Sequence, residues 1–227
     1  MLQRLLDIIL SATALLLLAP LLLPITLALR FTGEGEIFFV QQRVGRGGQY
    51  FGLYKFATML KDSPNLGTGT VTVKDDPRVL PLGKFLRKTK INELPQLLNI
   101  LLGDMSIIGP RPQTQRCFDG FPECSQTEII KVRPGLSGIG SIIFRGEEDM
   151  MHTSKDPDNF YDNVIMPYKG KLEEWYVANQ GIWTYIKSIF VTAWVVIFSE
   201  SQLPWRAFQN LPEPPTELRQ LVNWPRV

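Results

Sequence analysis

The feature that most constrains this chain is an uncharged apolar run from Ile8 to Leu29. As a helix rising about 1.5 Å per residue, the run would be about 33 Å long, which is enough to cross the hydrocarbon core of a bilayer. Thirteen of its residues are Leu or Ile, and at about −0.5 kcal/mol each they contribute roughly −6 kcal/mol toward insertion. We therefore expect this segment to enter a membrane.

Two prolines, Pro20 and Pro24, lie inside this run. An interior proline costs a helix about 3 kcal/mol and bends it, so we expect a broken helix that enters and leaves the membrane by the same face. A straight span is the alternative, since membrane helices tolerate prolines whose backbone partners are replaced. A cleaved signal peptide fits less well, because the run is long and Arg4, the only preceding cation, is neutralised by Asp7.

Composition narrows the function. The chain has 24 Lys and Arg against 22 Asp and Glu, for a net charge of +2, which is too small to indicate nucleic acid as the main partner. One histidine, His152, and two cysteines, Cys117 and Cys124, exclude a zinc cluster built from these residue types. We expect both cysteines to be free thiols and His152 to lie at the surface.

Residues 37–40 and 50–56 are β-prone and flank a glycine-rich segment, 43–48, which predicts a β-hairpin. A phosphate-binding loop is the alternative, but the segment lacks the Gly-Lys-Ser/Thr ending of a P-loop. A loop is expected over residues 61–76, and helical signals return from Leu82.

Three cations share one face of this predicted helix, because Lys84, Arg87 and Lys88 are spaced i, i+3 and i+4. Such a face is solvated, contacts anionic lipid headgroups or clamps a diphosphate. Asn92 follows closely and, as a good N-cap residue, predicts a helix start with Glu93 in its first turn. Free N–H groups at a helix start attract phosphate, so the cations and this start together would frame a nucleotide diphosphate.

Two proline-stiffened turns supply further cations. Arg111 lies between two prolines, a setting that can hold a guanidinium for bidentate contact with a phosphate or a base. Arg133 precedes another proline in a second basic turn. Asp104, in a Gly-Asp-Met-Ser segment, is either a turn residue or a metal ligand.

The last third of the chain is aromatic, and all five tryptophans lie between Trp175 and Trp224. The run 182–198 carries one charge, Lys187, and is short for a membrane span. Its aromatic residues favour a helix at the membrane interface, and a buried core helix is the alternative. Beyond Leu211 the chain is proline-rich and is expected to be irregular.

In their order along the chain, these motifs closely resemble the bacterial sugar transferases, the monotopic polyprenyl-phosphate phosphoglycosyl transferases. The resemblance covers about residues 1–140 and, more loosely, the C-terminal helices, and it is specific because seven individually weak motifs occur in one fixed order. After the apolar run these are Gln42-Arg43-Val44-Gly45, Tyr54-Lys55-Phe56, Gly83-Lys84-Phe85-Leu86-Arg87-Lys88-Thr89, Glu93-Leu94-Pro95-Gln96-Leu97, Gly103-Asp104-Met105-Ser106, Gly109-Pro110-Arg111-Pro112 and Arg133-Pro134-Gly135-Leu136-Ser137-Gly138.

The resemblance implies a reaction. Sugar 1-phosphate would pass from a UDP-sugar to undecaprenyl phosphate, with Mg²⁺ and release of UMP, as the first membrane-committed step of surface polysaccharide or glycoconjugate synthesis. It also implies a catalytic domain on the cytoplasmic face of the bacterial inner membrane, anchored by a re-entrant helix. The family breaks that helix at a Ser-Pro pair, which corresponds to Ala19-Pro20 here. Pro20 would therefore be the membrane kink, with the polar part of the break weakened.

The sequence departs from the family at its catalytic dyad, which is Asp-Glu in well-known relatives and Asn92-Glu93 here. A neutral amide cannot form the family's aspartyl phosphosugar intermediate. Four hypotheses follow: Glu93 takes over as nucleophile or general base, Glu147 or Glu148 supplies the missing charge, the lipid phosphate attacks directly, or the chain is catalytically weakened or inactive. Some relatives pair Asn-Glu with a similar Phe-Arg-x-Glu-Glu segment, which favours a natural subgroup.

The sequence therefore predicts an α+β fold with a re-entrant membrane helix over 1–32, a small α/β catalytic domain with a β-hairpin over 33–145, and interfacial helices with a Pro-rich tail over 146–227. We expect Asn92 and Glu93 at the catalytic centre and Glu93 with Asp104 at Mg²⁺. The expected partners are a UDP-sugar, undecaprenyl phosphate and the bilayer. A homodimer, contacts with downstream glycosyltransferases and a non-catalytic scaffold that only binds nucleotide-sugar are left open. The expected phosphate-binding residues are Lys84, Arg87, Lys88, Arg111 and Arg133.

Overall fold

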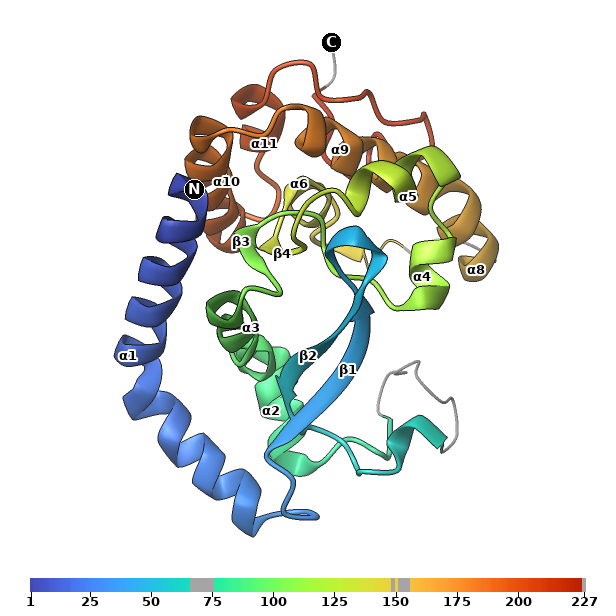
Figure 1. Cartoon of the computed structure of the whole chain (residues 1–227). Coiled ribbons are helices and arrows are strands. Elements are labelled where there is room, and N and C mark those ends of the chain that lie inside the picture. The colour runs from blue at the N-terminus through green and yellow to red at the C-terminus, as the bar shows by residue number, and fades with distance from the viewer. Residues whose placement is uncertain (66–75, 148–149, 151–155, 226–227) are drawn as a thin grey trace. The chain divides into compact units, whose positions relative to one another are not determined.

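The computed structural model describes residues 1–65, 76–147, 150 and 156–225 (Figure 1). Contacts divide the chain into two compact units that interleave along the sequence. The amino-terminal unit holds Asp7–Gln42 and Gly52–Gly103, and the carboxy-terminal unit holds Met1–Leu6, Arg43–Phe51 and Asp104–Val227. Helices combine with two small two-stranded sheets, so the expected mixture of α and β structure is confirmed.

Helix α1 runs from Leu2 to Phe31 without interruption, so the helix is not broken at its prolines. It is bent instead, and Figure 1 shows its ribbon changing direction part-way along. Pro20 and Pro24 cannot donate a hydrogen bond to the preceding turn, which is a common cause of such bends. Most of its large apolar side chains are exposed, Leu16 by 75%. Among the described residues, α1 is the one helix long and apolar enough to cross a membrane.

The predicted β-hairpin is confirmed. Strand β1 (Phe38–Val44) pairs with β2 (Tyr50–Phe56). The turn between them includes the short helical segment η1 (Arg46–Gly48), in which Gly47 and Gly48 have positive φ. Glycine adopts this backbone conformation without steric cost.

The amino-terminal unit has a small core of its own. Ile25 and Leu29 of α1, Phe56 of β2 and Leu86 of helix α2 form one buried cluster. Helix α2 spans Pro81–Lys88 and is the helix that the sequence predicts from Leu82. Leu86 packs inward, whereas Phe85, Lys84 and Lys88 are exposed to the solvent.

A buried asparagine fastens helix α3 (Gln96–Leu102) to strand β2. The side-chain oxygen of Asn99 accepts a hydrogen bond from the Tyr54 backbone N–H at 3.0 Å. Its amide nitrogen donates to the Gly52 carbonyl at 2.7 Å. The amino end of α3, and the turn that precedes it, are therefore held in a defined position on the hairpin.

In the carboxy-terminal unit, strands β3 (Ser106–Ile108) and β4 (Gly135–Ser137) pair in parallel, with Ser106 opposite Gly135 and Ile108 opposite Ser137. The backbones beyond this pair lie unusually close. A Cβ added to Gly135 would lie 2.1 Å from the Gly109 nitrogen, and one added to Gly138 would lie 2.1 Å from the Gly109 oxygen. Only residues without a side chain can make this contact.

The main hydrophobic core of this unit lies among its helices. Ile139, Leu172 and Tyr185, from three different helices, are almost fully buried there, and Leu218 and Val222 of the tail join them. The described residues beyond Leu211 form no helix or strand, as predicted. The helices are α4 (Gln115–Asp119), α5 (Glu123–Ile129), α6 (Ile139–Ile143), α8 (Pro157–Phe160), the π-helical segment η4 (Tyr161–Ile165), α9 (Met166–Ala178), α10 (Ile182–Ile197) and α11 (Leu203–Ala207).

Helix α10 has one buried face and one exposed face, and the buried face fits the interpretation as a core helix. One face enters the core through Tyr185, Ser188, Val191 and Val195. The other face is apolar and exposed, and its residues are Trp183, Phe190, Trp194 and Ile197.

Several predicted features lie outside the described residues. These are Glu148 and His152, together with residues 66–75 of the expected loop. The remaining part of that loop contains a short 3-10 turn, η2 (Ser63–Asn65). The sequence-based boundaries at residues 32 and 145 stay predictions.

Substituting Gly135 by alanine should destabilise the protein by about 2–3 kcal/mol, because the new Cβ would overlap the Gly109 backbone, which cannot rotate away. Thermal unfolding of the detergent-purified protein, followed by circular dichroism, measures the loss. Gly146→Ala is the matched control, since its Cβ would meet nothing within 4 Å. Equal melting temperatures for the two variants would contradict the close contact.

Candidate active site

The three predicted cations lie together on α2. Lys84 and Lys88 are exposed and Arg87 is half-buried, while Leu86 on the opposite side is fully buried. The Arg87 guanidinium lies 3.7 Å from the Met59 sulfur, so part of this side chain is held against the protein. The helix therefore presents a cationic surface that can meet an anionic group from solvent.

The chain reverses directly after α2. Lys90 adopts a left-handed conformation (φ 58°), and a short 3-10 turn, η3 (Ile91–Glu93), follows. Asn92 is only 8% exposed, and its side-chain oxygen has no hydrogen-bond partner among the described residues. Glu93 beside it is half-buried.

The expectation that Asn92 caps a helix is wrong. Helix α3 begins at Gln96, and Pro95 occupies its N-cap position. Asn92 instead lies inside the preceding 3-10 turn and makes no capping hydrogen bond. Its buried, unpaired amide oxygen is unusual, since a buried acceptor without a donor costs about 1–3 kcal/mol.

In the carboxy-terminal unit, the fold brings together the two predicted basic turns. Arg111 follows β3, Arg133 precedes β4, and both are half-buried. Gly109 and Gly135 connect the two turns, because the Gly135 N–H donates to the Pro110 carbonyl at 2.8 Å and the Gly109 N–H donates to the Ser137 carbonyl at 2.9 Å. Two guanidinium groups thus start from adjacent backbone segments.

The candidate compensating carboxylate Glu147 is already paired. Both of its oxygens lie 2.8 Å from the Lys169 ammonium on α9. The Lys169 side chain is only 2% exposed, and its ammonium also lies 5.8 Å from the centre of the Phe144 ring. Glu148, the second candidate, lies outside the described residues.

A second carboxyl on α9, Glu173, is more deeply buried, with 1% exposure. Burial raises its pKa to about 8, while Lys169 and the backbone N–H groups of Arg111 and Gly140 favour the charged form and limit the rise. Neither carboxyl oxygen completes a hydrogen bond to a described residue. Burial and the nearby Glu147 charge also raise the pKa of Tyr161, which keeps this phenol protonated.

The residues proposed to bind metal are Glu93, in the amino-terminal unit, and Asp104, half-buried in the carboxy-terminal unit. In the described part of the chain, no three acidic, histidine or cysteine side chains form a metal-binding group. Mg²⁺ does not require such a cage, because it commonly uses one or two carboxylates together with substrate phosphates and water. Glu93 is compatible with that kind of site.

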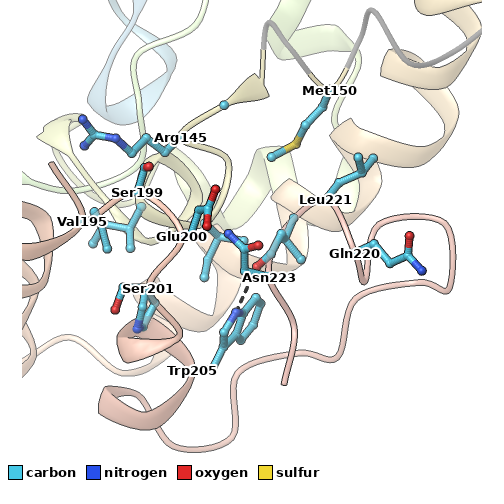
Figure 2. A pocket seen from close by; sticks show the side chains of 15 residues that line it. Arg145, Met150, Val195, Ser199, Glu200, Ser201, Trp205, Gln220, Leu221 and Asn223 are labelled. Atoms are coloured by element: carbon cyan, nitrogen blue, oxygen red, sulfur yellow. Dashed lines mark hydrogen bonds between the residues drawn. The ribbon is translucent and has the colours of Figure 1, made fainter. Parts of the chain in front are cut away.

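A cavity of about 520 Å³ opens in the carboxy-terminal unit. Figure 2 shows Arg145 on one side and the tail residues Gln220 and Asn223 on the other. The Arg145 guanidinium donates to the Val196 carbonyl at 3.1 Å. The lining residues are Ile142, Ile143, Arg145, Gly146, Met150, Val195, Ser199, Glu200, Ser201, Pro204, Trp205, Gln220, Leu221, Val222 and Asn223.

Comparison with known families agrees with the motif order. The family model described as "Bacterial sugar transferase" matches residues 1–199. The chain belongs to this family. The match includes both groups of candidate residues, on α2 and η3 and on the two basic turns, and it ends before the tail that lines one side of the cavity.

Curated members of the family with similar sequences carry names of one kind. The undecaprenyl-phosphate glucose phosphotransferase of Komagataeibacter xylinus is 33% identical over 88% of this chain and 36% of its own length. The UDP-glucose:undecaprenyl-phosphate glucose-1-phosphate transferase of Escherichia coli K12 is 34% identical over 85% of this chain and 39% of its own length. The undecaprenyl-phosphate galactose phosphotransferase of Salmonella typhimurium is 31% identical over 86% of this chain and 40% of its own length. This chain therefore spans less than half the length of these three relatives.

Sequence reasoning did not single out Lys169 and Glu173. Their spacing of four residues places them on one face of α9, and two ionisable residues within a buried helix are the signal that could have drawn attention to them. In the sequence of α9, however, apolar and polar residues do not separate onto opposite faces, so the sequence alone does not indicate which side chains are buried.

Replacing Lys169 by methionine should destabilise this family member by about 2–3 kcal/mol, because Glu147 would lose its partner for two charge-assisted hydrogen bonds. Chemical denaturation in detergent measures the change. Lys131→Met is the control, since Lys131 pairs with Glu128 at the exposed surface, where such a pair is worth about 0–1 kcal/mol. Similar losses of unfolding free energy in both variants would show that the buried Lys169–Glu147 pair stabilises the protein no more than the exposed Lys131–Glu128 pair does.

Proposed function

We propose that this chain transfers a sugar 1-phosphate from a UDP-sugar to a polyprenyl phosphate such as undecaprenyl phosphate, releasing UMP and starting a surface glycan. The observation that carries the proposal is the arrangement on α2 and η3, where three cations lead directly into the turn that holds Asn92 and Glu93. The printed names of the relatives, which include glucose and galactose phosphotransferases acting on undecaprenyl phosphate, support it.

In this reaction, an oxygen of the acceptor phosphate forms a bond to the donor's β-phosphorus, and the bond to the bridging oxygen breaks, so that UMP leaves. The transition state is highly anionic, and catalysis depends on positioning and on charge neutralisation. Lys84, Arg87, Lys88, Arg111 and Arg133 would neutralise phosphate oxygens, with Arg111 at the nucleotide end of the donor. Glu93 would hold Mg²⁺, which when bound would supply positive charge against the diphosphate, and Asp104 remains a ligand expected from the sequence alone.

Asn92 replaces the carboxylate that serves as the family's nucleophile, and an amide cannot take over that role. Glu93 adjoins it and is half-buried, whereas both oxygens of Glu147 already bind Lys169. This difference supports Glu93 as the carboxylate that acts in phosphoryl transfer. Asn92 would contact the substrate through its otherwise unpaired amide oxygen.

The protein would work at the surface of a membrane, because its lipid acceptor is confined there. The apolar α1 helix and the family together indicate membrane association. We propose that α1 is re-entrant at Pro20, that the exposed face of α10 lies in the interface, and that the catalytic part faces the cytoplasm at the bacterial inner membrane. The proline bend and the apolar α10 face support this placement.

Asn92 also favours a second candidate function, a membrane scaffold that binds UDP-sugar without turning it over. UMP release distinguishes the two functions. The purified protein would be incubated with undecaprenyl phosphate, Mg²⁺ and a panel of UDP-sugars. Release with one sugar would establish the transferase and identify its donor, whereas binding without release would favour the scaffold.

With that donor, Glu93→Gln should lower kcat by at least about a hundredfold, because the carboxylate assigned to phosphoryl transfer and to Mg²⁺ is lost. Glu147→Gln is the comparison and should retain kcat within about threefold, provided that its folding is confirmed by circular dichroism. Full turnover by the Glu93 variant would reject the assigned role. A selective loss in the Glu147 variant would transfer that role to Glu147.

The α10 face can be tested with single-tryptophan variants in nanodiscs that contain a doxyl-labelled lipid. Trp183 and Trp194 should be quenched at least about twofold more than Trp175, because the first two are exposed on the apolar face. Trp175 is the internal control, since it packs edge-on against Phe208. Equal quenching at all three positions would place α10 away from the lipid.

A further inference from the structure

Helix α9 carries a polar stripe that is almost completely buried. Lys169, Glu173 and Tyr176 are spaced i, i+4 and i+7, so they lie on one face of the helix. Their exposures are 2%, 1% and 2%. Three polar side chains that are so deeply buried need partners. The partners lie in the segments that carry Arg111 and Arg145.

The two ends of the stripe make direct contacts. Lys169 binds both oxygens of Glu147, two residues after Arg145. The Tyr176 hydroxyl donates to the Ile108 carbonyl at 3.0 Å, just before the turn that leads to Arg111. The stripe thus connects α9 to both arginine-bearing segments.

Glu173, at the middle of the stripe, faces the Arg111 turn and α6. A Cβ added to Gly140 of α6 would lie 2.3 Å from a Glu173 carboxyl oxygen, so the carboxyl presses against bare backbone. The backbone N–H groups of Arg111 and Gly140 both act on this carboxyl. The charged group that acts on it is Lys169 on its own helix, and Glu147 is paired with that same Lys169.

Glu173 is costly for stability. A buried polar group without completed hydrogen bonds costs about 1–3 kcal/mol, and a leucine of similar volume would avoid that cost. A buried polar group of this kind calls for an explanation other than packing. The position of this carboxyl beside the backbone N–H groups of Arg111 and Gly140 supplies such an explanation.

We propose that Glu173 is a positioning residue for Arg111, holding the Gly109–Pro112 turn so that the guanidinium faces the donor's phosphates. This inference rests on the proposed function, which gives Arg111 its role. Lys169 holds the segment that carries Glu147. Tyr176 holds the Ile108 carbonyl, just before the Gly109–Pro112 turn.

The test uses the full-length protein in detergent and compares Glu173→Leu with Glu173→Gln. Glu173→Leu should keep or raise the melting temperature, because the costly buried carboxyl is gone, yet raise the donor KM about tenfold with kcat within about threefold. Glu173→Gln keeps the shape and polar atoms, so it should restore the donor KM to within about threefold of wild type. Glu174→Ala is the control, since the neighbouring Glu174 bonds Ser125 on α5, and it should leave the donor KM unchanged.

Two further measurements separate positioning from general damage. Hydrogen exchange should accelerate about tenfold at the amides of Ile108, Gly109, Arg111 and Gln113 in Glu173→Leu and stay within about twofold in Glu174→Ala. When Arg111 is replaced by alanine, adding Glu173→Leu should change the donor KM less than twofold, because the two residues act as one unit. Unchanged exchange, or an equal change in KM with and without Arg111, would overturn the proposal.

The outcomes also separate this inference from the proposed function. A normal donor KM in Arg111→Ala would refute the phosphate-binding role of Arg111, whatever Glu173 does. Hydrogen exchange requires no substrate, so it tests the hold of Glu173 on the turn even if no UDP-sugar is turned over.

Discussion

The carboxy-terminal unit depends on one contact, the approach of two backbone segments at Gly109, Gly135 and Gly138. Each of these glycines lies so close to the backbone of the opposite segment that even an added methyl group would overlap it. The contact completes the short β3–β4 pair, and Gly138 then begins α6. Because Arg111 and Arg133 flank the contact, any loosening of the backbone there would also move apart the two segments that carry these arginines. Close packing of backbone against backbone therefore sets the spacing between the segments of Arg111 and Arg133.

The amino-terminal unit reaches a comparable result by different means. Its cations lie on one helix, α2, whose apolar face is fixed by Leu86 in a small core. A left-handed residue, Lys90, then turns the chain so that Asn92 enters the interior and Glu93 stays half-buried. Here helix periodicity and one unusual backbone angle, rather than a strand contact, arrange the polar groups. Each unit thus presents its own set of cations for an anionic ligand.

Features encoded by nearby residues could be predicted from the sequence. The glycine-rich turn predicted the hairpin, and the spacing of Lys84, Arg87 and Lys88 predicted their common helix face. Features that depend on distant segments could not be predicted. Strands β3 and β4 have three residues each, too few for a periodic signal, and the partners of α9 come from segments far away in the chain. Asn92 shows how a local rule can fail, since asparagine favours helix caps, yet Pro95 occupies the cap of α3 and leaves Asn92 in the turn before it.

The bend in α1 has a consequence for the lipid as well as for the protein. Without N–H groups at Pro20 and Pro24, the carbonyls of Leu16 and Pro20 lose their usual donors. Thr26 does not replace them, because its hydroxyl donates to the Leu22 carbonyl at 2.8 Å. In hydrocarbon, each unsatisfied carbonyl costs several kcal/mol, and water or lipid headgroups can relieve that cost only by reaching the middle of the helix. In an inserted α1, these two carbonyls would need donors from outside the helix, so that water, lipid headgroups or a neighbouring segment would have to reach its bend.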